Sequence, residues 1–272
     1  MARYVPAARI AMNAKAKVRT STTYDDSFFD KFQQDALESA RIVAPIVLQA
    51  IPAQSVIDIG CACGEWLAVF RDCGVRTIRG VDGEYIDRSR LLIDPQSFIA
   101  ADLSRDFDAG GVFDLALCLE VAEHLPKQFA RTLVRNLTAA APVILFSAAV
   151  PGQGGADHVN ERWPNYWRRL FAEQNYRMLD PIRPRIRDDR RVRWWYRQNM
   201  VIFASEGAIA GNPVLAAEAE RPLNELEWVH WYVIANRNEF RFLIKALRHI
   251  LARRFKYFLQ QKWIRPWRRR RG

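Results

Sequence analysis

The pattern of apolar and polar residues changes near residue 24 and from there follows a helical period. Apolar side chains that would share one face of this predicted helix are Phe28, Phe29, Phe32, Ala36, Ala40, Val43 and Val47. Spacings of three and four residues are typical of an amphipathic helix that packs against a core. Pro45 lies inside the pattern and interrupts it.

Short apolar runs then alternate with amphipathic segments. The apolar runs are SVIDIG, RTIRGVD, SFIAADL, VFDLALCLE and APVILFSAAV, and the amphipathic segments include EWLAVFRDCG and LPKQFARTLVRNLTAA. This alternation predicts a parallel sheet that helices cover on both faces. No helix is predicted between the last two runs, YRMLDPI and RQNMVIFAS, which indicates an antiparallel hairpin at one edge. The predicted fold class is therefore α/β, a Rossmann-like, doubly wound, seven-stranded and mostly parallel sheet with an antiparallel edge hairpin.

Positive charge is concentrated near the C-terminal end of the chain and indicates further segments. Of the 272 residues, those from 239 to 272 include 12 Lys/Arg and one Glu, which accounts for the whole net charge of +11. We expect a disordered basic arm at 1–23, with an organelle transit peptide as the alternative, and a catalytic domain at 24–205. A linker is expected at 206–222, followed by a basic amphipathic helical extension at 223–272.

The extension has three candidate partners. Residues 240–263 have a continuous apolar stripe opposite Arg and Lys, which suits an anionic membrane surface contacted through 240–272. Docking of the stripe on the catalytic domain or on a second subunit is an alternative, and RRRR at 268–271 also suits nucleic acid. No apolar run approaches the ~20 residues of a membrane span. We expect a cytoplasmic protein, with a peripheral position at the inner face of the membrane if the stripe binds lipid.

Cysteines give little support for a disulfide framework. Cys61, Cys63, Cys73 and Cys118 lie in apolar or glycine-rich contexts, so we interpret them as reduced thiols. Cys61-Ala62-Cys63 has no second Cys or His pair near it in sequence, and zinc sites normally require one. Small apolar filling is the favoured interpretation of these two thiols.

The stretch IDIGCACGEW at 57–66 places a glycine turn after the first predicted strand. Ligands of open parallel sheets bind beyond the carboxyl ends of the strands, where glycine allows close approach to the backbone. The next strand ends at Asp82, 22 residues after Gly60, a separation at which an acid accepts the hydroxyls of a ribose. The following strand ends at Asp102.

A site for NAD(P), as in an oxidoreductase, is the competing interpretation of this turn. Residues 60–64 read Gly-Cys-Ala-Cys-Gly and lack the middle glycine that admits a pyrophosphate. Asp58 would also repel a phosphate. Both features are compatible with a nucleoside cofactor that has no phosphate and carries a positive charge.

Four motifs in order, VIDIGCACG, GVDG, AADL and FDLALCLEVAEHLP, resemble those of class I S-adenosylmethionine-dependent methyltransferases, over about residues 25–205. The resemblance implies S-adenosylmethionine as cofactor. The cofactor-binding residues that it implies are Asp58, Gly60, Cys61, Ala62 and Gly64 around the methionine part, Asp82 and Gly83 at the ribose, Asp102 and Leu103 at the adenine, and Leu119 and Glu120 near the methyl group. Ala62 departs from the family, which often has glycine there.

A metal site is a further hypothesis. Glu120, Glu123 and His124 would share one face if the chain is helical there, and His158 would supply a fourth ligand. Carboxylates with imidazole suit Mg²⁺ or Mn²⁺. The Glu-x-x-Glu-His pattern is similar to that of ubiquinone-pathway O-methyltransferases and small-RNA 2′-O-methyltransferases, in which it binds a divalent ion. The alternative is that these residues only shape the pocket.

Methyl transfer to a hydroxyl needs a base or a metal, and His158 and His124 are the candidate catalytic bases. The acceptor-binding residues are predicted to be Asn160, Glu161, Trp163 and Tyr166. Seven arginines at 183–199 would suit an anionic acceptor, unless they form a solvated hairpin loop paired with Asp188 and Asp189.

The sequence therefore predicts a methyltransferase that acts on a hydroxyl of a sugar, a glycan precursor or a related small molecule. An RNA 2′-O-methyltransferase and a small-molecule enzyme of quinone type are alternatives within the same class. A catalytically silent scaffold or membrane-tethering protein is the alternative outside it.

Overall fold

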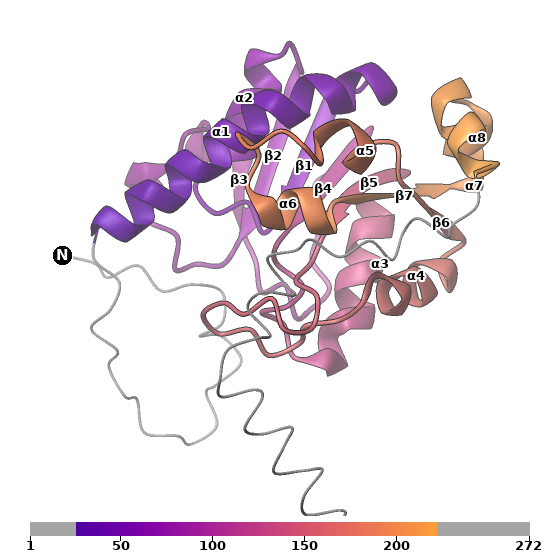
Figure 1. Cartoon of the computed structure of the whole chain (residues 1–272). Coiled ribbons are helices and arrows are strands. Elements are labelled where there is room, and N and C mark those ends of the chain that lie inside the picture. The colour runs from indigo at the N-terminus through magenta and orange to yellow at the C-terminus, as the bar shows by residue number, and fades with distance from the viewer. Residues whose placement is uncertain (1–25, 222–272) are drawn as a thin grey trace, which may run out of the picture. The chain divides into compact units, whose positions relative to one another are not determined.

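Residues 26–221 are described by the structure, a computed structural model of the chain (Figure 1). The expected basic arm at 1–23 and the expected extension at 223–272, with its membrane, protein or nucleic-acid contacts, lie outside these residues. Among the described helices, none combines the length and the apolar character that a membrane crossing requires.

A seven-stranded sheet forms the centre of the fold, in the order β3-β2-β1-β4-β5-β7-β6. The strands are β1 (Ser55–Ile59), β2 (Thr77–Asp82), β3 (Phe98–Ala100), β4 (Leu115–Leu119), β5 (Val143–Ser147), β6 (Tyr176–Leu179) and β7 (Val201–Ser205). Neighbouring strands are parallel except for β7, which is antiparallel to both β5 and β6. The predicted fold class is confirmed for the sheet, including its antiparallel edge.

Helices cover both faces of this sheet. They are α1 (Asp26–Ala50), α2 (Glu65–Asp72), α3 (Ala130–Ala140), α4 (Pro164–Ala172), α5 (Arg183–Ile186), α6 (Trp194–Asn199), α7 (Glu206–Ala210) and α8 (Pro213–Ala219). Short 3-10 helices within residues 26–221 are η2 (Arg88–Arg90), η3 (Pro95–Ser97) and η4 (Lys127–Phe129). Figure 1 shows α1 and α2 on one side of the sheet and α3 and α4 on the other.

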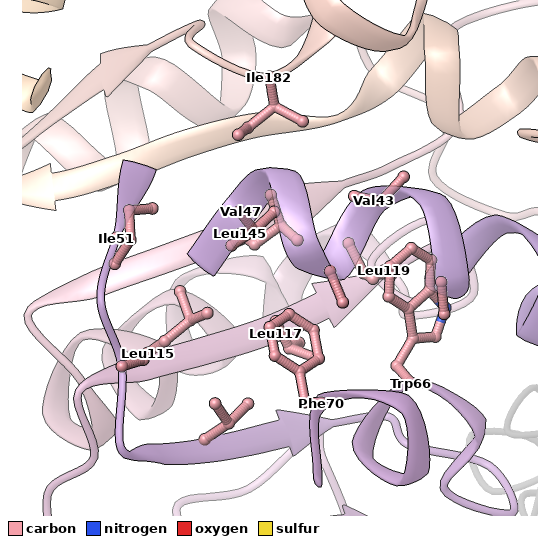
Figure 2. Close-up of a cluster of buried hydrophobic side chains, with 14 of the residues drawn as sticks. Val43, Val47, Ile51, Trp66, Phe70, Leu115, Leu117, Leu119, Leu145 and Ile182 are labelled. Atoms are coloured by element: carbon pink, nitrogen blue, oxygen red, sulfur yellow. The ribbon is translucent and has the colours of Figure 1, made fainter. Parts of the chain in front are cut away.

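The buried apolar side chains form two cores, one on each face of the sheet, and successive residues of a strand belong alternately to one and the other. Leu115, Leu117 and Leu119 of β4 point toward α1 and α2 and belong to the first core, where Figure 2 shows them near Val47 and Phe70. The intervening Ala116 and Cys118 of β4 belong to the second core, together with buried residues of α3 and α4. Because successive strand residues face opposite sides, one central strand contributes to both cores.

The connection between β6 and β7 differs from the prediction of a hairpin without a helix between its strands. The two strands are antiparallel neighbours as predicted, but residues 180–200 between them hold α5 and α6. Ile186, Val192 and Tyr196 are buried in the first core and hold this connection against the sheet. Since β6 runs parallel to β5, the connection starts at the carboxyl edge of the sheet, the edge at which the glycine turn also lies.

Two short helices, α7 and α8, lie within the segment that was expected to be a linker, 206–222. Ser205 accepts a hydrogen bond from the backbone N–H of Ala208 at the start of α7, and Asn212 caps α8 in the same way. Ile209 and Leu215 of these helices are buried in the first core. Two caps and two apolar anchors are sufficient to order a segment whose alanine and glycine content suggested a linker.

Candidate active site

The glycine turn after β1 packs closely against the segment after β4. Gly60 and Gly64 have φ angles of 92° and 86°, in the left-handed region that favours glycine. A Cβ on Gly60 would lie 2.3 Å from Cγ2 of Val121, so no side chain fits there. Ala62 has a φ of 48°, also left-handed, so the turn forms although alanine replaces the glycine that is frequent in the family.

The carboxyl group of Asp82, at the end of β2, lies beside this turn and is buried. Its Oδ2 accepts a hydrogen bond of 2.8 Å from the backbone N–H of Ala62. Its Oδ1 accepts bonds from the backbone N–H of Gly83, at 2.7 Å, and from the hydroxyl of Tyr85. Burial raises the pKa of Asp82, and these three donors oppose the rise. Asp82 therefore connects the ends of β1 and β2 at the place predicted for ribose binding.

Three buried acids surround the turn. Burial raises the pKa of Asp58 to about 8, and the neighbouring charges of Asp82 and Glu65 contribute to the rise. Glu65, the first residue of α2, accepts a hydrogen bond of 3.0 Å from Gln33 of α1, and burial raises its pKa as well. This concentration of carboxyl groups favours a cationic ligand over a phosphate.

Cys61 and Cys63 fill space near the turn. Both are buried free thiols, and a Cβ on Gly80 of β2 would lie 2.7 Å from the Sγ of Cys61. Burial raises the pKa of both thiols, to about 12 for Cys63, which disfavours the thiolate that metal binding requires. The geometry agrees with their interpretation as apolar filling.

The predicted adenine-binding residues follow β3. Asp102 is partly exposed, and its Oδ1 accepts hydrogen bonds from the backbone N–H and the hydroxyl of Ser104, at 3.0 and 2.6 Å. Its other carboxylate oxygen lies 3.3 Å from the guanidinium of Arg105. Leu103 is buried in the second core. The side chain of Asp102 thus stabilises its own turn in this structure.

Glu120 follows β4 and has a φ of 56°, which is uncommon for a residue with a side chain. Its carboxylate accepts hydrogen bonds from Gln153 Nε2, at 2.8 Å, and from Asn199 Nδ2, at 3.0 Å. Asn199 Nδ2 also donates to Gln153 Oε1 at 2.8 Å, which closes a ring of three side chains. Both amides are buried, and the sequence analysis assigned neither of them to the site.

Glu123, His124 and His158 meet at the same edge of the sheet. Their candidate ligand atoms all lie within 4.8 Å of one another. The segment after Glu120 is a turn and not the helix that was considered, with the N–H of His124 bonded to the carbonyl of Val121 at 3.0 Å. The group does not include Glu120, whose oxygens bind Gln153 and Asn199 instead.

Polar atoms of this cluster lack partners. Glu123 is fully buried, and neither of its carboxylate oxygens has a hydrogen bond of normal geometry, although the backbone of Ala149 and the side chain of Glu120 lie near enough to shift its pKa. Nδ1 of His124 is also buried and unpartnered. Burial, followed by the charge of Glu120, raises the pKa of Glu123, whereas burial and the nearby His158 lower the pKa of His124 to about 4. Buried groups without partners are costly, so a cation at this position would satisfy them.

A loop after β5 holds His158 in place. Its Nδ1 lies 3.1 Å from Oε1 of Glu161, and the same carboxylate accepts bonds from the N–H groups of Gly152 and Gly154. Asn160 is buried, accepts a hydrogen bond of 2.8 Å from Arg162 and lies 3.4 Å from the carbonyl of Ala122. Asn160 and Glu161, predicted to bind the acceptor, are thus engaged within the loop, and Glu161 orients a candidate base.

The two remaining predicted acceptor residues are aromatic. Trp163, just before α4, is 41% exposed, and Tyr166 is partly buried under the guanidinium of Arg162, 5.2 Å from the ring centroid. Trp167, next in the chain, is buried in the second core and serves packing. An exposed aromatic surface therefore lies on the segment that follows His158.

Arginines between β6 and β7 mostly have partners within the protein. Arg183 pairs with Asp180 at 2.7 Å, Arg191 pairs with Asp189 at 2.6 Å, and Arg193 pairs with Asp35 of α1. These pairs support the alternative in which local acids neutralise the run, although the segment is helical and not a simple loop. An anionic acceptor is not required to explain them.

Residues 29–198, more than half of the chain, match the family described as "Methyltransferase domain". A search of curated proteins finds no match.

The solved structures that are similar to the chain include the following three. An O-methyltransferase family protein from Burkholderia thailandensis is 15% identical with a TM-score of 0.48, and the alignment covers 67% of this chain and 60% of that protein. A SAM-bound amino pentose methyltransferase from Micromonospora echinaspora is 16% identical with a TM-score of 0.49, over 68% of this chain and 99% of that protein. The methyltransferase domain of a bacterial Hen1 protein is 19% identical with a TM-score of 0.45, over 61% and 98%.

The family match covers the glycine turn, Asp82, Asp102 and the segment from Leu119 to His124. These are the positions at which the sequence predicted a phosphate-free nucleoside cofactor. The chain belongs to the methyltransferase-domain family and is a class I S-adenosylmethionine-dependent methyltransferase.

Proposed function

We propose that this enzyme transfers a methyl group to a hydroxyl of a sugar, a glycan precursor or a related small molecule, at a site where Glu123, His124 and His158 bind a divalent cation. The observation that carries the proposal is the cluster of these three side chains, whose ligand atoms lie within 4.8 Å of one another. Unpartnered buried atoms of Glu123 and His124 support a cation ligand at this position.

The donor set favours Mn²⁺ of the two ions that the sequence suggested. Mg²⁺ prefers an all-oxygen environment, whereas imidazole is a ligand of transition-metal ions, the class to which Mn²⁺ belongs. His124 has a pKa of about 4 because it is buried and lies beside His158, so its ring is neutral at pH 7 and keeps a lone pair for a metal. A bound divalent cation lowers the pKa of a coordinated hydroxyl and makes it a better nucleophile.

His158 has a defined orientation at this site. Because the carboxylate of Glu161 only accepts hydrogen bonds, Nδ1 of His158 carries the proton of their 3.1 Å contact, and Nε2 has the free lone pair. That nitrogen serves as a metal ligand, or as the general base if no metal binds. Glu161 therefore acts as a positioning residue for either role.

The acceptor class rests on two aromatic residues of the segment that follows His158. Trp163 is exposed on the segment after His158, and Tyr166 is partly exposed one helical turn further on. Aromatic faces of this kind stack on sugar rings, and a sugar supplies adjacent hydroxyls that can contact a cation together. The 2′-hydroxyl of RNA has the same chemistry, so an RNA acceptor is an outcome that the test must distinguish.

Metal binding is tested by titrating the purified protein with Mn²⁺ alone and following the heat of binding. We expect about one equivalent to bind, and Glu123→Gln to weaken binding by roughly tenfold or more. Glu173→Gln, a partly exposed acid that pairs with Arg131, is the matched control and should bind Mn²⁺ as the unmodified protein does. Equal affinities of all three proteins would exclude Glu123 as a ligand.

The acceptor is tested with S-adenosylmethionine labelled in its methyl group. The protein is incubated with nucleotide-sugars, soluble glycan precursors and short RNAs, each with and without a chelator. Label in a sugar or glycan that the chelator prevents supports the proposal. Label in RNA alone would mean that RNA, and not a sugar, is the acceptor. Methyl transfer that the chelator does not affect would mean that no metal is needed and that His158 acts as the base.

A further inference from the structure

The hydrogen bonds of Asp82 leave little room for a ribose. A carboxylate accepts about four hydrogen bonds, two on each oxygen. Oδ1 of Asp82 already accepts from the N–H of Gly83 and the hydroxyl of Tyr85, and Oδ2 accepts from the N–H of Ala62. One ribose hydroxyl can bind to Oδ2 without any change, but a second hydroxyl needs a lone pair on Oδ1.

Only one of the three present donors can leave easily. The N–H groups of Gly83 and Ala62 belong to the backbone, and Ala62 has left-handed glycines two residues away on each side, at Gly60 and Gly64. Tyr85 is a side chain, partly buried at the edge of the first core, in the turn that follows Asp82. Rotation of its phenol would free a lone pair on Oδ1 without moving the backbone.

The position of Asp82 makes it the acid that meets the ribose. It lies at the carboxyl end of β2, beside the glycine turn that follows the neighbouring β1, which is where nucleoside hydroxyls bind in open α/β sheets. Its carboxyl group is buried, and a buried carboxylate without donors is unfavourable. The Tyr85 hydroxyl adds a third donor to this carboxylate, beside the N–H groups of Gly83 and Ala62.

We propose that the Tyr85 hydroxyl occupies the place of one ribose hydroxyl on Asp82 and is displaced when S-adenosylmethionine binds. Tyr85 is then a cofactor-site residue that competes with the ribose for Asp82 and lowers the apparent affinity for the cofactor. This inference concerns the cofactor pocket and does not depend on the proposed acceptor or metal.

The experiment measures affinity by calorimetry for S-adenosylhomocysteine and for its 2′,3′-dideoxy analogue, which lacks both ribose hydroxyls. Tyr85→Phe keeps the ring and removes the competing hydroxyl. We expect this variant to bind S-adenosylhomocysteine about two- to tenfold more tightly, because the binding-competent state no longer requires displacement of the phenol. Its affinity for the dideoxy analogue should be unchanged.

Tyr176→Phe is the matched control. Tyr176 lies at the amino end of β6, at the opposite edge of the sheet, and its hydroxyl donates to the carbonyls of Thr138 and Ala141. This variant should bind both ligands with the affinity of the unmodified protein, although it loses two hydrogen bonds.

Weaker or unchanged binding of S-adenosylhomocysteine by Tyr85→Phe would overturn the proposal, since it would mean that the phenol remains on Asp82 in the complex. An equal change with both ligands would also overturn it, because the effect would then not lie at the ribose. Tyr85→Leu gives a second variant without the hydroxyl if Tyr85→Phe does not fold.

Discussion

Asn199 Nδ2 donates a hydrogen bond of 3.0 Å to Oε1 of Glu120, which joins two buried segments 79 residues apart in the chain. The same amide donates to Gln153, so its orientation is fixed, because Glu120 Oε1 and Gln153 Oε1 both need a donor. The ring of Glu120, Gln153 and Asn199 connects the end of β4, the loop after β5 and the end of α6. The shape of the candidate active site thus depends on the connection between β6 and β7.

Asn199→Asp tests this relationship with little change of volume. The substitution places a carboxylate against Glu120 and removes two donated hydrogen bonds. We expect the free energy of unfolding to fall by about 1–3 kcal/mol at pH 8, as judged by urea denaturation. Asn165→Asp, at an exposed position of α4, should change stability by less than about 0.5 kcal/mol. Equal losses at the two sites would show that the ring contributes nothing specific.

Gly60→Ala tests the packing of the glycine turn. The new Cβ would lie 2.3 Å from Val121 Cγ2, in addition to the strain of a φ of 92°. Gly74→Ala is the matched control because Gly74 has a similar φ of 99° and no heavy atom within 4 Å of the added Cβ. Strain alone costs about 1–2 kcal/mol, so Gly74→Ala should lose roughly that amount. Gly60→Ala should lose clearly more and should also weaken S-adenosylmethionine binding.

The architecture could be predicted because it depends on local patterns. Alternating apolar runs indicated the strands, and their separation by helical segments indicated parallel neighbours. The ring around Glu120 had no such signal, since Gln153 and Asn199 are polar residues in segments distant from Glu120 and no periodicity marks them as buried. Only the path of the chain shows that they meet.

Three differences between the prediction and the structure have the same physical origin. The seven arginines at 183–199 indicated a solvated loop, but Ile186, Val192 and Tyr196 in the same segment are buried and hold α5 and α6 against the sheet. The segment 206–221 lacked a long apolar stripe, and single buried residues order its two helices. Glu123 and His124 were selected by helical spacing, yet a turn brings them to His158. Tertiary contacts determine whether such short segments form helices or turns, and a local sequence pattern does not show those contacts.

Asp58→Asn tests the effect of burying an acid beside Asp82 and Glu65. Folding raises the pKa of Asp58 from 3.8 to about 8, chiefly through burial. The folded protein therefore binds this proton more tightly, so the stabilisation is complete below pH 4 and is lost as the pH rises through 8. Compared with the unmodified protein, Asp58→Asn should gain roughly 2–5 kcal/mol in stability between pH 5 and pH 9.

Chemical denaturation across that pH range measures the difference for Asp58→Asn. Asp72→Asn, at an acid whose side chain is 68% exposed, is the control and should follow the unmodified protein at every pH. A constant difference between Asp58→Asn and the unmodified protein would mean that Asp58 does not change its protonation on unfolding in this range.

Asp82→Ala tests the position of the cofactor. Removal of the carboxylate leaves the ribose hydroxyls without their acceptor, and we expect the affinity for S-adenosylmethionine to fall by roughly 30- to 200-fold. Asp106→Ala, at an acid whose side chain is 72% exposed and pairs with Arg135, should bind the cofactor normally. Retention of full affinity by Asp82→Ala would place the ribose elsewhere.

Gly155→Ala tests the position of His158 without altering a candidate ligand. An added Cβ on Gly155 would lie 2.3 Å from Nε2 of His158, so the imidazole must move away. If Glu123, His124 and His158 bind Mn²⁺ together, this movement should weaken Mn²⁺ binding by roughly tenfold or more, measured by calorimetry. Binding of S-adenosylmethionine should stay within a factor of about two, because none of the predicted cofactor contacts involves His158.

Gly154→Ala is the adjacent control, with no heavy atom within 4 Å of its added Cβ. Since Gly154 has a φ of 71°, it carries the backbone strain without the collision with His158. Equal Mn²⁺ affinities for the two variants would therefore show that His158 is not a metal ligand. His158 would then act as a base that Glu161 orients.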